Sequence, residues 1–252
     1  MPVRDRSLSD EGVVLRHSNW GEADRLLWIY TLGHGKIRAV AKGVRKIRSR
    51  KAGHLEPFTR VRLMMAKTRD LPIITQAEAI DGYWNLREDL LKVGYAAYVV
   101  ELLDRFTFDE DENRGLYRLL SDTLHRLNTG IDVQLTLRYY EVRLLDLLGY
   151  RPQLFNCAGC QAGIQAQDQY FSNSMGGAVC PSCGKQTPDA KPISLQALKY
   201  LRHFQRSSFE ESARARLSDE VNDEIERLVQ NYMVFNLERG LNTPAFIRLV
   251  KK

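Results

Sequence analysis

The sequence has no long hydrophobic run and few cysteines, and both shortages restrict what the chain can be. No apolar stretch approaches the roughly 20 residues that a membrane-spanning helix needs, so we expect a soluble protein without a membrane contact. The first residues are polar and of mixed charge and lack the apolar core of a signal peptide, which predicts that the protein is not secreted. The chain also lacks internal repeats and low-complexity tracts.

Positive charge is concentrated in the first third of the chain. The whole chain of 252 residues has a net charge of +6, whereas residues 1–82 alone contain 16 Lys and Arg against 9 Asp and Glu, a net charge of +7. A basic segment on a nearly neutral remainder indicates contact with a nucleic acid or another acidic surface. A solvated charged face that only keeps the protein soluble is the alternative.

The same region alternates between hydrophobic and polar residues in five short runs, at residues 12–17, 25–32, 36–44, 58–66 and 73–80. Gly and Pro residues separate the runs, and the pattern predicts five β-strands. Five short strands fit a small closed barrel, with the oligonucleotide-binding (OB) fold as the leading candidate and an SH3-like barrel as an alternative. Trp20 lies in a polar turn and is expected to be exposed, where it can stack on a base. For Trp28, Tyr30 and Phe58 we expect core packing.

The segment between the third and fourth predicted strands contains six cations within residues 42–51 and no acid. A basic loop between two strands is suited to contacting the phosphates of a nucleic acid. Arg38 and Arg62 are possible additions on the neighbouring strands. The predicted DNA-binding residues are therefore Arg38, Lys42, Arg45, Lys46, Arg48, Arg50, Lys51 and Arg62.

After Gly82 the spacing of apolar residues becomes helical. Stripes at residues 95–106, 116–127, 137–148, 198–204 and 221–235 predict a helical bundle, with Ser194 as the N-cap of the fourth helix. An acidic run at residues 109–112 precedes the second helix. We expect this run to cap that helix and to interact with its dipole, rather than to bind a cation.

All four cysteines lie in one short segment that is inserted between the predicted helices. They form two Cys-x-x-Cys pairs separated by nineteen residues: Cys157, Cys160, Cys180 and Cys183. Four thiolates at this spacing complete a tetrahedral shell around Zn²⁺ and leave no open position for water. Two disulfides are the alternative, but a chain without a secretion signal is expected in a reducing compartment. We therefore predict one structural zinc ion per chain, on which the segment depends to fold.

An enzymatic alternative comes from the triplet His54-Leu55-Glu56, because nucleobase deaminases combine an H-x-E triplet with a Cys-x-x-Cys motif. Those enzymes have a proline before the first cysteine, whereas Asn156 and Val179 hold these positions here. A site with three protein ligands would also leave one cysteine pair unused. We therefore predict that the protein is not an enzyme.

Together these patterns predict an α+β multidomain protein. The expected domains are an N-terminal OB-fold β-barrel at residues 1–82, an α-helical domain at residues 83–152 and 190–252, and an inserted four-cysteine zinc module at residues 153–189. The zinc module is expected to be structural, since residues 161–179 contain no Lys or Arg for contacting DNA.

In this arrangement the sequence resembles the bacterial DNA repair and recombination mediator family RecO. The match covers nearly the whole chain in the right order, except for the stretch after Gly240. The segments that carry the resemblance are Gly12-Val13-Val14-Leu15, Gly21-Glu22-x-Asp24, Thr31-Leu32-x-x-Gly35, residues 41–46, Ser49, Leu55-Glu56-Pro57-Phe58, Arg143-Leu144-Leu145 and Leu148-Gly149-Tyr150-x-Pro152-x-Leu154, which runs into the first cysteine pair.

The resemblance implies binding to single- and double-stranded DNA, annealing of complementary strands, and help in loading the RecA recombinase onto DNA coated by single-strand binding protein. It implies RecR and the C-terminal tail of single-strand binding protein as partners, with RecA as an indirect one. The implied location is the bacterial cytoplasm, at the nucleoid. The alternatives are a zinc-containing RNA-binding or transcription adaptor, and a protein-interaction scaffold whose basic loop binds acidic peptide tails.

Overall fold

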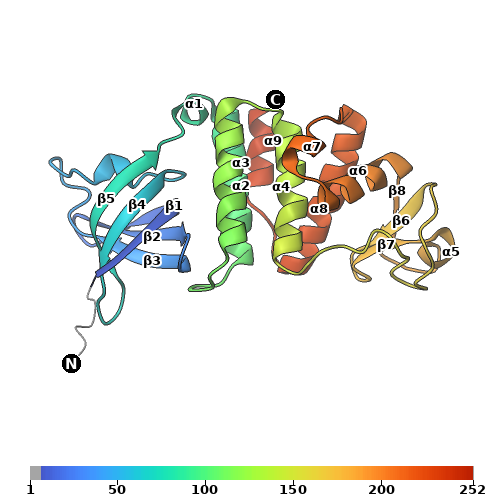
Figure 1. Cartoon of the computed structure of the whole chain (residues 1–252), viewed down its shortest axis with the longest axis horizontal. Coiled ribbons are helices and arrows are strands. Elements are labelled where there is room, and N and C mark those ends of the chain that lie inside the picture. Colours follow the sequence, from blue (N-terminus) through green and yellow to red (C-terminus); the bar gives the residue numbers. More distant parts are fainter. Residues whose placement is uncertain (1–6, 252) are drawn as a thin grey trace. The chain divides into compact units, whose positions relative to one another are not determined.

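A computed structural model describes residues 7–251 (Figure 1). Their contacts divide the chain into two compact units. The first unit contains the chain up to Gly130 together with the segment from Asn242 onward, and the second unit is Ile131–Leu241. The three-part division expected from the sequence, at residues 1–82, at 83–152 with 190–252, and at 153–189, stays a prediction.

The first unit begins with a five-stranded closed barrel whose strand order is β1-β2-β3-β5-β4. The long first strand pairs antiparallel with both β2 and β4, and β3 and β5 meet through a parallel pairing at Val40 and Ile73. A closed barrel of five short strands is the OB architecture, so the expected fold class is confirmed. The strands are β1 Ser7–Trp20, β2 Asp24–Thr31, β3 Gly35–Ala41, β4 Arg60–Ala66 and β5 Ile73–Asp81.

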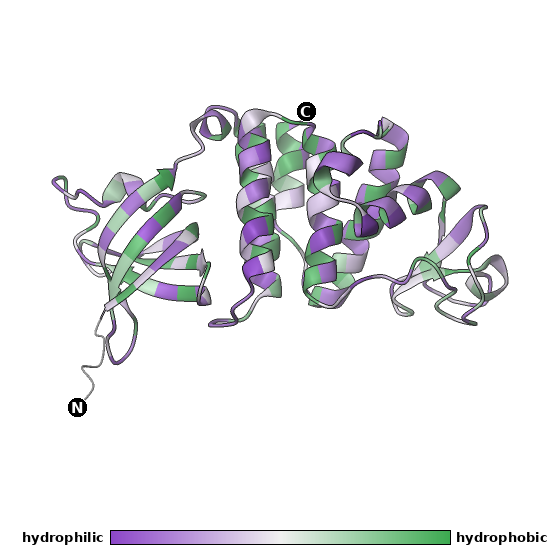
Figure 2. Ribbon diagram, in the orientation of Figure 1, coloured by the Kyte–Doolittle hydropathy of each residue, from purple (hydrophilic) through white to green (hydrophobic). Residues whose placement is uncertain are grey.

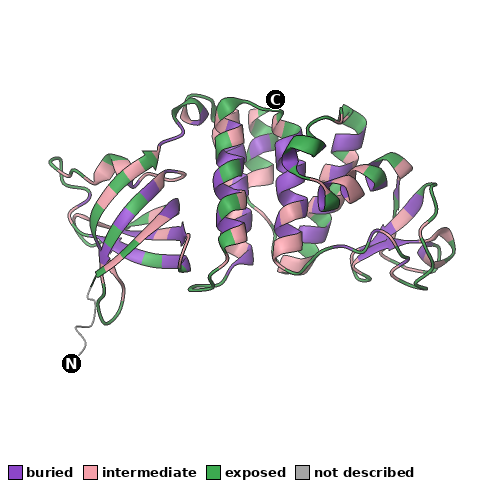
Figure 3. Cartoon of the chain, viewed as in Figure 1, coloured by how far each residue is buried: buried purple, intermediate pink, exposed green. Residues whose placement is uncertain are grey.

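The alternation of side chains along the strands positions the barrel core. On β4, Val61, Leu63 and Met65 are fully buried, whereas Arg62 and Met64 between them are exposed. Figure 2 shows this alternation as changes between hydrophilic and hydrophobic residues along the barrel strands, and Figure 3 shows the matching buried positions. Each buried side chain of this size stabilises the fold by about 1.5–3 kcal/mol. A slip of one residue in register would turn Arg62 into the core, so the pattern fixes which cations face outward.

Among the described residues, four α-helices complete the first unit. Asp89 caps the second helix by accepting hydrogen bonds from the amides of Leu91 and Lys92. The last helix was not expected from the sequence, and it packs on α2 through Glu101, whose carboxylate accepts from the amides of Asn242 and Thr243. The helices are α1 Trp84–Arg87, α2 Leu90–Phe106, α3 Arg114–Thr129 and α9 Thr243–Val250.

The expected capping role of the acidic run at residues 109–112 is wrong. The N-cap of α3 is Asn113, whose side chain accepts from the amide of Leu116, and no acid lies in the first turn of that helix. The acidic run instead continues along the edge of β3, where the amide of Glu110 donates to the carbonyl of Lys36 at 2.8 Å. Tertiary pairing with a distant strand has therefore replaced the local interaction that the sequence suggests.

The second unit combines helices with a small antiparallel sheet of order β7-β6-β8. Ser194 caps α6 by accepting from the amide of Ala197, as expected, and α4, α6 and α8 pack against one another. The sheet is attached to α8 by an edge-to-face contact between the rings of Phe171 and Tyr232, 5.5 Å apart. The elements are α4 Val133–Leu147, β6 Gln169–Ser172, β7 Gly177–Val179, α5 Pro181–Gly184, β8 Lys191–Ile193, α6 Leu195–Arg206, α7 Phe209–Ser212 and α8 Asp219–Leu237.

The sequence predicts that the protein makes no contact with a membrane. Within residues 7–251, none of the helices combines the length and the apolar composition that crossing a membrane requires.

Candidate nucleic-acid interface and metal centre

The basic segment forms an ordered loop between β3 and β4. Two backbone hydrogen bonds shape its first half, from the amide of Lys46 to the carbonyl of Gly43 and from the amide of Ser49 to the carbonyl of Lys46. A short 3₁₀ turn at Ala52–His54 follows. The loop therefore has a defined backbone from which its charged side chains extend.

Four of the predicted contacts are exposed cations of this loop. Within the described part of the chain none of them forms an ion pair, so their charges are available to an external anion. When such cations bind the phosphates of a nucleic acid, they release the counterions condensed on it, which favours binding at this loop. The four residues are Lys42, Lys46, Arg48 and Arg50.

Two other residues of the loop also serve the fold. The guanidinium of Arg45 donates to the carbonyl of Glu22 at 3.2 Å, although the residue stays exposed. Lys51 is half-buried, and its ammonium donates to the carbonyl of Ile74 at 2.9 Å. Burial lowers the pKa of Lys51, while the nearby carboxylate of Asp24 acts in the opposite direction. Lys51 therefore has a structural partner, which makes it less available to a phosphate than the other cations.

The two predicted contacts on the strands lie beside acids. The guanidinium of Arg38, on β3, forms an ion pair with Asp109 at 3.0 Å, and the two side chains are 48% and 43% exposed. Arg62, on β4, is exposed, and the strand register places it opposite Glu78 of β5. The ion pair of Arg38 competes with any incoming phosphate, whereas Arg62 forms no ion pair within the described residues.

A close backbone approach holds the acidic run next to β3. Gly35 has a φ of +62°, and a Cβ atom at this position would lie 2.0 Å from the carbonyl oxygen of Asp111. Only glycine fits such a contact without displacing the acidic run. The pairing of Arg38 with Asp109 is therefore built into the fold, and no local feature of the sequence predicts it.

Two further exposed cations, which were not among the predicted contacts, lie near Arg38. Lys67 and Arg69 occupy the loop between β4 and β5 and, with Arg38 and Pro72, line a groove of about 700 Å³. Asp109 and Glu112 line the same groove. The two cations are separated by a single residue and follow the end of a predicted strand. This spacing indicates a possible phosphate contact, but the denser cluster of cations at residues 42–51 was the stronger signal.

His54 and Glu56, the residues of the deaminase-like triplet, have structural partners in the barrel. The imidazole of His54 accepts the amide hydrogen of Ala79 at 3.1 Å. Glu56 forms an ion pair with Arg25 at 2.8 Å. Burial raises the pKa of Glu56, but the hydrogen bonds and charges of Arg25 and His17 together lower it by more. These contacts explain both residues without a catalytic role.

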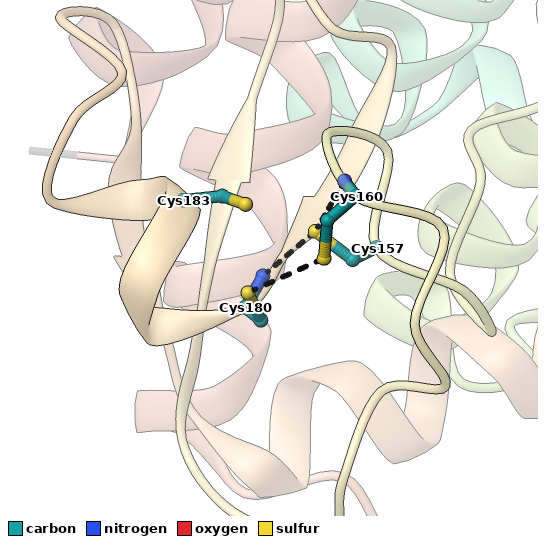
Figure 4. A group of neighbouring side chains, drawn as sticks. All are labelled: Cys157, Cys160, Cys180 and Cys183. Carbon is teal, nitrogen blue, oxygen red and sulfur yellow. Dashed lines mark hydrogen bonds between the residues drawn. The ribbon is translucent and has the colours of Figure 1, made fainter.

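The four cysteines lie together in the second unit, as Figure 4 shows. Cys157 and Cys160 belong to a turn in which the amide of Gln161 donates to the carbonyl of Cys157. Cys180 directly precedes α5, and Cys183 lies within it. All four are free thiols, and their sulfur atoms lie within 4.8 Å of one another, so the group can hold a metal ion.

Backbone amides point at the most buried sulfur of the group. The amides of Cys160 and Cys180 donate to Sγ of Cys157 at 3.5 and 3.2 Å. Burial raises the pKa of Cys157, but these hydrogen bonds outweigh it and lower the pKa to about 6. Hydrogen bonds with Cys180, Cys160 and Cys157 raise the pKa of Cys183 to about 12. The amide donors thus favour a thiolate at Cys157, and a thiolate is the form of cysteine that binds a metal ion.

Close contacts position the two segments that carry the cysteines. A Cβ atom on Gly184, the residue after Cys183, would lie 2.4 Å from the ring of Tyr170 on β6. The guanidinium of Arg202 on α6 donates to the carbonyl of Leu154 at 2.9 and 2.7 Å, which fixes the chain shortly before Cys157. The second cysteine pair therefore packs on β6, and the first follows a segment bound to α6.

Comparison with known proteins identifies the family. Residues 6–83 match the sequence model described as Recombination protein O N terminal, and residues 87–245 match the one described as Recombination protein O C terminal. A DNA repair protein RecO of Roseiflexus sp. (strain RS-1) is 44% identical over 250 residues, which cover 99% of this chain and 88% of that protein. DNA repair proteins RecO of Pelotomaculum thermopropionicum and of Dehalococcoides mccartyi (strain CBDB1) are 35% and 34% identical and match 94% of this chain and 92% and 93% of their own lengths. The chain therefore belongs to the recombination protein O (RecO) family.

Proposed function

We propose that this protein acts in DNA repair and homologous recombination as a non-enzymatic mediator that binds single- and double-stranded DNA. The names of its relatives support the repair role. The observation that carries the proposal is the ordered basic loop of the OB barrel, which presents Lys42, Lys46, Arg48 and Arg50 to solvent without acidic partners among the described residues. Phosphate contacts of this kind depend little on base sequence, as a protein that acts on any damaged strand requires.

The same charges suggest how the protein could anneal complementary strands. Two strands repel each other through their phosphates, and cations placed between them lower that repulsion. The proposed role includes assistance to RecA loading on DNA coated by single-strand binding protein, with RecR and the acidic tail of that protein as partners. The proposed setting is the bacterial nucleoid, where these substrates occur.

Zn²⁺ is the metal that we propose for the cysteine group. A Zn–S distance of about 2.3 Å gives sulfur atoms about 3.8 Å apart in a tetrahedral shell. Sγ of Cys160 and Sγ of Cys180 are 3.9 Å apart, and all four sulfurs fit within the same small volume. A shell of Cys157, Cys160, Cys180 and Cys183 would cross-link the two knuckles and leave no open position, which is a structural role.

Strand annealing tests the proposed function most directly. Two complementary DNA oligonucleotides, one carrying a fluorophore and the other a quencher, should anneal faster with the protein than without it. Substituting Lys46 and Arg48 together should remove most of this acceleration. Comparing the affinity for single-stranded DNA with that for RNA of the same sequence tests the alternative of an RNA-binding protein, which predicts stronger binding to RNA.

Neutralising the acid beside Arg38 should strengthen DNA binding. The Asp109→Asn substitution removes the partner of a half-exposed guanidinium and frees it for a phosphate. Because exposed ion pairs contribute about 0.2–1 kcal/mol, we expect an increase in affinity of about 1.4- to 5-fold, measured by fluorescence anisotropy at low salt.

The control for Asp109→Asn is Asp122→Asn, which removes the same charge. Asp122 is exposed on α3 and does not line the groove that contains Arg38. Equal gains from both substitutions would show that only net charge matters, and would remove Arg38 from the proposed interface.

A further inference from the structure

The turn between β1 and β2 presents an aromatic ring to solvent. Trp20 is the last residue of β1, pairs with Asp24 across the turn, and is 50% exposed. The other two tryptophans differ, because Arg16 lies 3.6 Å from the ring centre of Trp28 and Arg87 lies 5.9 Å from that of Trp84. Among residues 7–251, no cation or second ring stacks on Trp20. Single exposed apolar residues are common on protein surfaces, so exposure alone does not indicate a binding site. The residues around the ring must provide that indication.

The basic loop is attached to this turn by its backbone. The amide of Arg45 donates to the carbonyl of Ala23 at 2.9 Å, and the amide of Gly43 donates to the carboxylate of Asp24 at 2.6 Å. The guanidinium of Arg45 adds a bond to the carbonyl of Glu22. These bonds hold the start of the cationic loop against the turn that carries Trp20. Aromatic ring and cations therefore share one end of the barrel.

The tip of the loop adds a second apolar group. The hydrogen bond between the amide of Ser49 and the carbonyl of Lys46, 2.9 Å long, makes Ile47 and Arg48 the central residues of a turn. The side chain of Ile47 has no cover, with a relative exposure of 103%, and cations flank it on both sides. The loop tip thus alternates apolar and positively charged groups, whereas the turn between β1 and β2 also carries Glu22 and Asp24.

An alternation of this kind fits one class of ligand. Cations bind the sugar-phosphate backbone, and an exposed ring offers a flat apolar face on which an unpaired base can stack. The bases of a duplex are already stacked on each other and cannot reach such a ring without unpairing. The turn is therefore suited to single-stranded nucleic acid.

We propose that Trp20 forms a base-stacking subsite for an unpaired nucleobase, beside the phosphate contacts of the basic loop. The subsite rests on the proposed DNA binding and adds to it a contact that only single strands can make. It gives the protein a preference for single strands that charge alone does not provide. Ile47 lies on the same loop, between Lys46 and Arg48, and adds an exposed apolar side chain beside the phosphate contacts.

The test compares Trp20→Ala with Trp84→Ala, a control that removes a more exposed tryptophan on α1. Each variant is titrated with an oligo-dT strand, with an abasic strand of the same length, and with a blunt duplex. Because stacking of one base contributes about 1–3 kcal/mol, Trp20→Ala should weaken binding to oligo-dT by about 5- to 150-fold. Its binding to the abasic strand and to the duplex should match that of the wild type, and Trp84→Ala should behave as wild type throughout.

A conservative variant keeps the test valid if Trp20→Ala folds poorly. Trp20→Phe retains an aromatic face and should keep most of the affinity for oligo-dT. In the wild type, oligo-dT should quench tryptophan emission more than the abasic strand does, and this difference should disappear in Trp20→Phe. Equal quenching by both strands, or equal losses on both in Trp20→Ala, would overturn the subsite. Failure of the wild type to bind either strand would instead refute the proposed DNA binding.

Discussion

Replacing Cys157 with serine should unfold the segment around the four cysteines and release its metal. Cys157 is fully buried, and its sulfur accepts the amides of Cys160 and Cys180. Structural zinc contributes about 10–16 kcal/mol to folding in zinc-finger peptides, as much as the whole stability of many domains. A three-stranded sheet with strands of three or four residues cannot offset a loss of that size.

Metal content and limited proteolysis measure this effect. The wild type, purified without chelator, should contain one equivalent of zinc and resist cleavage between residues 157 and 183. Cys157→Ser should contain well under one equivalent and be cut there, and a chelator should produce the same cleavage in the wild type. The control Ser182→Ala changes an exposed residue between Cys180 and Cys183 and should keep both metal and resistance. A Cys157→Ser protein that retains its zinc would contradict the assignment.

Reversing the charge of Lys46 and Arg48 should strongly weaken DNA binding while the barrel stays folded. Both side chains are exposed and make no ion pair within residues 7–251, so the substitution to Glu removes no packing. Two phosphate contacts become two repulsions, for which we expect a loss of roughly 10- to 100-fold at low salt. Fluorescence anisotropy measures the affinity, and an unchanged melting temperature confirms the fold.

The matched control reverses two cations on the exposed side of α3. Arg114→Glu with Arg118→Glu changes the net charge of the protein by the same amount, but neither residue belongs to the predicted interface. This variant should retain most of the DNA affinity. If both double variants lose affinity equally, the loop has no special role and the overall charge accounts for binding.

The sequence was sufficient for the barrel because local patterns determine its elements. Alternating residues located all five strands, and the Gly residues between them located the turns. The length of β1 was underestimated, because its ends at Ser7 and Trp20 are set by pairing with β4 and β2 rather than by its own hydrophobic pattern. Hydrogen bonds to β2 and β4 hold polar residues in the extended conformation at both ends of β1, beyond the residues whose alternating pattern predicts a strand.

The interface was only partly predictable, for a physical reason. Exposure of the loop follows from the density of its charges, since so many cations cannot be buried together. The pairing of Arg38 with Asp109 joins residues far apart in the chain, and neither carries a local signal for the other. The partner of Lys51 was equally unpredictable from the sequence. It is the backbone carbonyl of Ile74, and every residue has a backbone carbonyl.

The structure of the cysteine segment was also only partly predictable from the sequence. Spacing alone indicated the two knuckles, which the structure brings together. The small sheet around them was not expected, because β6, β7 and β8 are each too short to show an alternating pattern. The helix α9 was missed because its anchor, Glu101, lies on α2.

The salt dependence of single-strand binding tests most directly whether the loop cations hold phosphates. If about five phosphates are contacted, the logarithm of the affinity should fall with the logarithm of the salt concentration at a slope near −3.5. Neutralising Lys46 and Arg48 to Ala should make that slope shallower by about 1.4, since each lost contact contributes about 0.7. The same slope in the wild type and in this variant would contradict the account, because the phosphates would then be bound elsewhere on the protein.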